Sequence, residues 1–106
     1  MATGRLGAVD ISAAANTTVY TVPASTFTVA TISICNRGAS PATIRIAVAS
    51  TGTPGAEEYL EYDSSIVSHG VLERTGIVMD AGKLLVVYSS AASISAVVMG
   101  IETATA

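Results

Sequence analysis

The amino-acid sequence predicts an all-β domain, an antiparallel β-sandwich of about seven or eight strands with jelly-roll or immunoglobulin-like topology and no major helix. Val, Ile and Thr supply 34 of the 106 residues and Leu only 5, and β-branched side chains favour strands over helices. Apolar residues recur at every second position over most of the chain, which is the period of a strand. Turn signals recur roughly every 8 to 12 residues, as in two packed antiparallel sheets.

The chain length corresponds to a single domain, so residues 1–106 are expected to share one core. Only 13 residues are charged, which argues against intrinsic disorder. An immunoglobulin domain with its usual Cys, Trp and Cys set is excluded, because the chain has one Cys and no Trp.

Clusters of Pro, Gly, Asn and Ser separate the expected strands. Pro23 ends the first clear strand or places it at a sheet edge. In the next strand Ala30, Ile32 and Ile34 occupy one face, opposite Thr31 and Ser33. The expected strands cover residues 20–22, 26–36, 43–48, 57–63, 71–79, 83–89 and 93–102.

The middle and the end of the chain follow the same logic. Ile44, Ile46 and Val48 share the inner face of one strand, and the strand over 57–63 is expected to bury Leu60 and Tyr62. The strands over 71–79 and 83–89 flank Asp80, Ala81 and Gly82, and such a three-residue loop with Gly in the left-handed conformation predicts a hairpin. Residues 103–106 form a short polar tail.

Bulk charge and hydropathy exclude several classes of partner. Five basic residues against 8 acidic ones, a net charge of −3, do not provide the positive surface that nucleic-acid binding needs. The sequence contains no basic amphipathic helix and no apolar stretch suited to a membrane helix. Residues 1–5 are not followed by a signal-peptide core, so we expect cytoplasmic synthesis, with no nucleic-acid and no membrane partner.

Few side chains could carry out chemistry. His69 lies in a turn, where it is expected to be exposed rather than to act as a general base or a metal ligand. Cys35 is expected to be a buried small hydrophobe. We therefore expect no catalytic residue, no metal and no cofactor.

An acidic group, residues 57–63, could bind calcium or provide paired carboxylates for glycoside hydrolysis. Glu61 and Asp63, however, have the spacing of one strand face. They are expected to occupy the solvated face beside buried Leu60 and Tyr62.

The charge is unevenly distributed along the chain. Residues 57–83 carry 8 of the 13 charges, whereas the stretch from Leu84 to Ile101 is uncharged and apolar on both strand faces. Such strands are normally buried on both faces. We expect the second face of these strands to pack against another subunit or another protein; the alternative is that the segment before Asn16 folds back over them.

Short strings distributed along the chain resemble a known group of proteins. They are Tyr20-Thr21-Val22-Pro23-Ala24, Asn36-Arg37-Gly38, Glu61-Tyr62-Asp63, Gly70-Val71-Leu72-Glu73-Arg74-Thr75-Gly76 and Val86-Val87-Tyr88-Ser89-Ser90. From about Arg5 to Glu102 the chain resembles small virion proteins of tailed bacteriophages, including phages of cyanobacteria. The resemblance implies a non-enzymatic β-sandwich of the phage particle, made in the host bacterial cytoplasm.

The combined expectation is a capsid decoration protein that binds other virion proteins and forms a homo-oligomer, with a trimer as one option. Residues 1–15 are expected to act as an N-terminal docking arm, and Arg37, Arg45 and the acidic group of residues 57–63 as rim charges. A charge introduced at Val87 or Val97 is expected to abolish incorporation without unfolding the chain. The expected interface residues are Arg5, Leu6, Val9, Ile11, Leu85, Val87, Val97, Met99 and Ile101.

Two alternatives have different partners. The first is a tail- or fibre-associated position in the virion. The second is a carbohydrate-binding β-sandwich that contacts the host surface, for which Tyr59, beside Glu57 and Glu61, is the expected aromatic platform.

Overall fold

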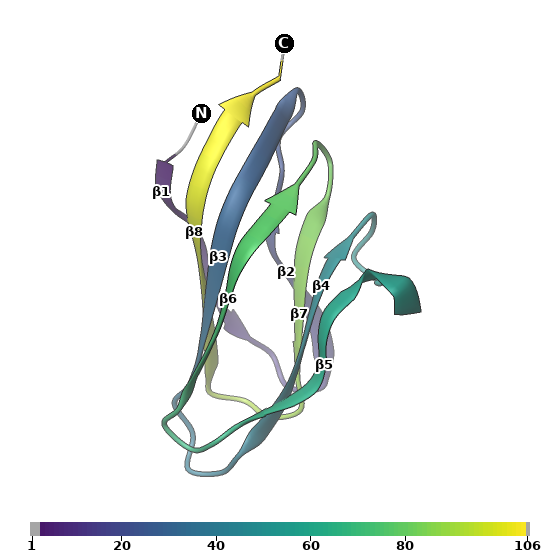
Figure 1. Ribbon diagram of the computed structural model, residues 1–106. Helices are drawn as coiled ribbons and strands as arrows, with labels where there is room; N and C mark the ends of the chain where they lie inside the picture. Colours follow the sequence, from purple (N-terminus) through teal and green to yellow (C-terminus); the bar gives the residue numbers. More distant parts are fainter. Residues whose placement is uncertain (1–2, 106) are drawn as a thin grey trace.

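The protein is a two-layer β-sandwich in the computed structural model, which describes residues 3–105 (Figure 1). The prediction of an all-β antiparallel sandwich is confirmed, and the described residues contain no helix longer than the three-residue 3₁₀ turn η1. The elements are β1 (Thr3–Ile11), β2 (Ala15–Thr21), β3 (Thr26–Asn36), β4 (Ala42–Ala49), η1 (Ala56–Glu58), β5 (Tyr59–Ile66), β6 (Val71–Met79), β7 (Leu84–Ser89) and β8 (Ile94–Ala104).

The strand order identifies the topology as a jelly roll. One four-stranded sheet has the order β1-β8-β3-β6 and the other β2-β7-β4-β5; we call them the 1-8-3-6 sheet and the 2-7-4-5 sheet. The antiparallel pairs β1 with β8, β2 with β7, β3 with β6 and β4 with β5 are nested inside one another. A long antiparallel ribbon that reverses between β4 and β5 and then rolls up gives this arrangement, so the immunoglobulin-like alternative is wrong.

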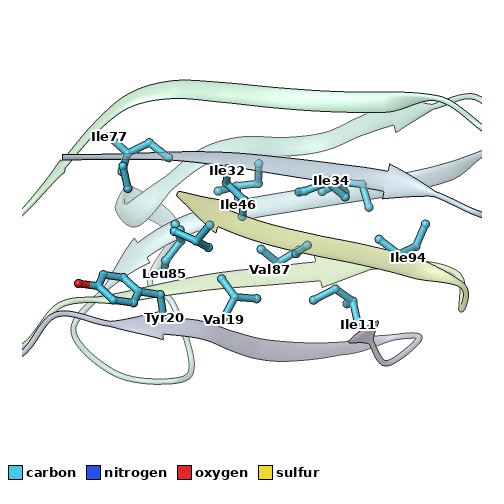
Figure 2. Close-up of a cluster of buried hydrophobic side chains, with 14 of the residues drawn as sticks. Ile11, Val19, Tyr20, Ile32, Ile34, Ile46, Ile77, Leu85, Val87 and Ile94 are labelled. Atoms are coloured by element: carbon cyan, nitrogen blue, oxygen red, sulfur yellow. The ribbon is translucent and has the colours of Figure 1, made fainter. Parts of the chain in front are cut away.

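The core lies between the two sheets and is built from alternate residues of each strand (Figure 2). In β3, Ile32 and Ile34 are fully buried, and in β4 Ile44 and Ile46 are fully buried. Each such side chain stabilises the fold by roughly 1.5–3 kcal/mol relative to an exposed position. The two-residue period seen in the sequence therefore identifies the inner face of β3 and β4 correctly.

The N-terminal segment, expected to be a docking arm over residues 1–15, forms an edge strand of the 1-8-3-6 sheet from Thr3 to Ile11. Strand β1 pairs with β8 from Thr3 opposite Ile101 to Ile11 opposite Ile94. It lies beside β8 at the sheet edge and does not fold across the outside of the sheet. Glycines in this segment hide the strand from sequence-based prediction, because Gly has low β-propensity.

The expected polar tail is also partly strand. Thr103 and Ala104 extend β8 and pair with Phe27 and Thr26. Ala106 lies outside the described residues.

The loop over residues 80–82 joins the two sheets, so the predicted hairpin is wrong. Strand β6 pairs with β3, whereas β7 pairs with β2 and β4. Gly82 does adopt the left-handed conformation, with φ of 81°, and its N–H donates to the Val22 carbonyl. Turn residues specify a change of direction, but they do not determine whether the following strand pairs with the preceding one or crosses to the other sheet.

A buried polar group connects the sheets near the end of β8. The hydroxyl of Tyr20 on β2 donates to Oε2 of Glu102 on β8, and it lies 2.9 Å from Oγ1 of Thr28 on β3. Tyr20, Thr28 and Glu102 are all buried. Burial, and then the hydrogen bond to Glu102, raise the pKa of Tyr20 above its ordinary value.

Replacing Tyr20 with Phe is expected to lower the free energy of unfolding by about 1.5–3 kcal/mol, because a hydrogen bond to a buried carboxylate is lost. Folded Tyr20 keeps its proton at a pH where the unfolded chain has lost it. The stability gained from Tyr20 is therefore complete below pH of about 10 and is lost as the pH rises towards the raised pKa of the folded state.

Urea unfolding of the wild type and of Tyr20→Phe at a series of pH values measures this difference, with the exposed Tyr62→Phe as the control. A stability difference between wild type and Tyr20→Phe that does not change up to pH of about 11 contradicts the account.

Candidate interaction surface

The outward side of the 1-8-3-6 sheet, which we call the outer face, carries the exposed apolar side chains of this sheet. In β8, Ala96 and Val98 are buried in the core, so the intervening Val97 and Met99 point outward. Beyond them Ile101 is 55% exposed. In β3, Phe27 and Val29 alternate in the same way with buried threonines.

Strand register brings these side chains together. Val78 on β6 lies opposite Val29 on β3, and Val29 lies opposite Ile101 on β8. Their exposed fractions are 68%, 43% and 55%. Neighbouring strands are about 4.8 Å apart, so these three residues form a continuous apolar row across three strands. Phe27 and Met99 extend this row along β3 and β8.

The nine predicted interface residues separate into three groups. Arg5, Val97, Met99 and Ile101 occupy the outer face. Leu6 and Val9 pack against the edge of the core. Ile11, Leu85 and Val87 are buried between the sheets and cannot face a partner, so their assignment to an interface is wrong.

Sequence reasoning missed Phe27, Val29 and Val78 on the outer face. The alternation of β3 contains the necessary information. Phe27 and Val29 have the same parity as the outward Thr31 and Ser33, so extending the pattern by four residues places both on the outer face.

Strand β7 is apolar on both sides because the chain itself covers its second side. Val86 points away from the core and is nevertheless only 2% exposed, and its outward neighbour Ala47 on β4 is fully buried. Tyr59 pairs with Ala47. Thr18 on β2 pairs with Val86. The loop over residues 50–58 comes close to Thr18, since a Cβ atom on Gly52 would lie 3.9 Å from Thr18 Oγ1. At Val86 and Ala47 the outer side of the 2-7-4-5 sheet is therefore covered by the chain itself.

Four of the five cations form ion pairs within the chain. The expected rim charges Arg37 and Arg45 are among them. In the pair of Lys83 with Asp80, the hydrogen bond from Lys83 lowers the pKa of Asp80. The pairs are Arg37 with Asp10 at 2.5 Å, Arg45 with Asp63 at 2.7 Å, Arg74 with Glu61 at 2.6 Å and Lys83 with Asp80 at 3.2 Å. Within residues 3–105, Arg5 is the cation that has no such pair.

A bulge in β5 builds a second, aromatic surface. Ile46 lies opposite Glu61 and Ile44 opposite Ser64, so Arg45 faces two residues, Tyr62 and Asp63. Glu61 is on the same side of the sheet as Ile46, so Tyr62 points outward; it is 59% exposed, which contradicts its expected burial. Leu60 is half-buried against the core.

Both residues of the bulge contact Arg45. The guanidinium lies 4.2 Å from the ring centre of Tyr62 and 4.7 Å from that of Tyr88, while Asp63 accepts a hydrogen bond from Nε. The hydrogen bond to Asp63 raises the pKa of Arg45. Tyr59 meets Tyr62 edge to face, with ring centres 5.0 Å apart. These contacts hold the aromatic cluster in one arrangement.

The bulge also separates the two carboxylates that were expected to share one solvated face. Glu61 accepts a hydrogen bond from Arg74 of β6 and so connects the edges of the two sheets. Asp63 instead accepts a hydrogen bond from Arg45 on the outer side of the 2-7-4-5 sheet. A change of register of this kind cannot be recognised from residue spacing alone.

The remaining reactive side chains are scattered. His69 is exposed in the turn, as expected, whereas Cys35 is half-buried on the outer face rather than in the core. Residues 3–105 contain no pocket and no group of three His, Cys, Asp or Glu side chains suited to a metal ion. No helix in this part of the chain could span a membrane.

Comparisons with known proteins find similar solved structures. No family model matches the chain, and no curated protein matches it. The fold is similar to a chain of the solved structure "Cyanophage Pam1 capsid asymmetric unit", with a TM-score of 0.43 and 14% sequence identity, over 92% of this chain and 83% of that chain. This similarity assigns neither a family nor a function.

Proposed function

We propose that the protein is a non-enzymatic structural protein of a tailed-phage virion, a capsid decoration protein that binds other virion proteins through its outer face. The observation that carries the proposal is the apolar row of Val78, Val29 and Ile101. Large contiguous apolar patches on soluble proteins usually mark contacts with partners. Here the row extends across three strands of a sheet that nothing within the described residues covers.

The sequence resemblance supports the virion context. The string from Asn36 to Gly38, which resembles phage virion proteins, has a structural role here, because the buried Asn36 amide donates to the carbonyls of Ser40 and Ile66. Jelly rolls occur in viral capsid and lectin domains, although a fold alone does not determine function. The low charge of the chain also suits a subunit that is held in an assembly.

Quantitative mass spectrometry of purified particles tests this proposal. Particles assembled from the genome that encodes this chain are expected to contain many copies of it, in a fixed ratio to the major capsid protein. A few copies per particle would favour the tail or fibre position. Particles that lack the chain would contradict the proposal as a whole.

The aromatic cluster favours a second candidate function, binding of host carbohydrate. Sugars stack on exposed aromatic rings, and the structure adds Tyr62, which is more exposed than the expected platform residue Tyr59. If the cluster binds a glycan, Tyr62→Ala and Tyr59→Ala should each weaken binding on a glycan array by roughly tenfold or more. Tyr62→Phe keeps the ring and serves as the control. Equal signals from all these variants would reject this function.

A further inference from the structure

We infer that the outer face binds a second copy of this chain about a two-fold axis that runs along the strands. The inference rests on the proposed function in one respect, that the outer face is an assembly surface. Its basis is the position of two charges, Arg5 and Glu73, at opposite edges of this face.

Strand register places both charges on the outer face. Arg5 on β1 lies opposite Met99, which points outward. Glu73 on β6 lies opposite Ser33, which also points outward. Both side chains are exposed, and neither forms an ion pair within the described residues. Because β1 and β6 are the two edge strands of the 1-8-3-6 sheet, the apolar row extends between a cation at one edge and a carboxylate at the other.

This arrangement is self-complementary for one orientation of two molecules. When two outer faces meet about a two-fold axis parallel to the strands, β1 of each molecule lies over β6 of the other. Arg5 then approaches Glu73 of the second copy, and the contact occurs twice, as in an isologous interface. The two side chains differ by one outward position along the strands, about 7 Å, which an extended Arg side chain can reach.

The same axis also brings the apolar residues of the two molecules into contact. It passes between β8 and β3, so Ile101 of one molecule meets Val29 of the other. A two-fold axis perpendicular to the strands would instead place β1 of one molecule over β1 of the other. The Arg5 side chains of both molecules would then lie at the same edge of the interface. Electrostatic complementarity fixes orientation at an interface, and here it selects the axis along the strands.

Charge exchange tests this arrangement directly. Arg5→Glu and Glu73→Arg each place like charges together at both symmetric contacts, so each variant should raise the dimer dissociation constant by roughly 10- to 100-fold. The double variant restores opposite charges and should return the constant to within about threefold of the wild-type value. Glu57→Arg makes the same change of charge at an exposed site away from the outer face, and should leave dimerisation unchanged.

Sedimentation equilibrium on the full chain, with circular dichroism to confirm folding, measures these constants. A wild type that is monomeric at protein concentrations up to about 1 mM overturns the inference, as does a trimer or a double variant no tighter than the single ones. If the wild type is monomeric but outer-face variants still fail to enter particles, the second-copy inference is rejected while the proposed function stands.

Discussion

Val87→Asp is expected to unfold the protein, although sequence reasoning alone predicted that a charge at this position would block assembly and preserve the fold. Val87 is fully buried between the sheets, opposite Ile46 on the neighbouring strand. An unpaired carboxylate at such a site costs several kcal/mol. Domains of this size are typically stable by only about 5–15 kcal/mol, so most of that stability is lost.

Thermal and urea unfolding followed by circular dichroism measure the effect. We expect a spectrum without β structure at 25 °C, or a midpoint that is lower by about 20 °C or more. Val67→Asp introduces the same change at a site that is 67% exposed, and it should unfold like the wild type. If Val87→Asp has the wild-type midpoint, Val87 is not in the core and the assignment of faces in β7 fails.

Val78→Asp is expected to have the opposite profile, with the fold preserved and assembly lost. Val78 is 68% exposed, so the substitution should change the free energy of unfolding by no more than about 0.5 kcal/mol. The new carboxylate is placed at one end of the apolar row. Burying a charge against an apolar partner surface is unfavourable, and incorporation into particles should decrease by roughly tenfold or more.

The matched control is again Val67→Asp, since the two valines are 68% and 67% exposed. Val67 lies in the connection between β5 and β6, outside the strands of the 1-8-3-6 sheet. Co-purification of each variant with particles, measured by quantitative mass spectrometry, gives the comparison. If both variants are incorporated equally well, the outer face is not the assembly surface.

Sequence patterns locate the strands accurately where one side is polar. In β3 and β4 the polar positions exclude one face from the core, so Ile32 and Ile44 are correctly placed inside. Strand β7 has no such contrast. Both Val86 and Val87 are buried, Val87 in the core and Val86 on the opposite side of the strand, and only tertiary structure distinguishes them.

The remaining errors have similar causes. The connection at Asp80–Gly82 has the residues of a tight turn, but whether two strands pair or separate depends on partners that are distant in the sequence. In β5 a register shift between Ile46 and Ala47, with Leu60 as the additional residue, reverses the strand parity and turns Tyr62 outward. The outer face could be predicted in part, from Val97, Met99 and Ile101, since β8 keeps its alternation to its end.

A reconstruction of the particle that contains this chain, at a resolution that shows side chains, tests the central claim most directly. The outer face is claimed to be the assembly surface, so Val29, Val78 and Ile101 are predicted to be buried against another protein chain. The claim is contradicted if these three side chains face solvent in the particle while the aromatic surface around Arg45 makes the contacts with neighbouring chains.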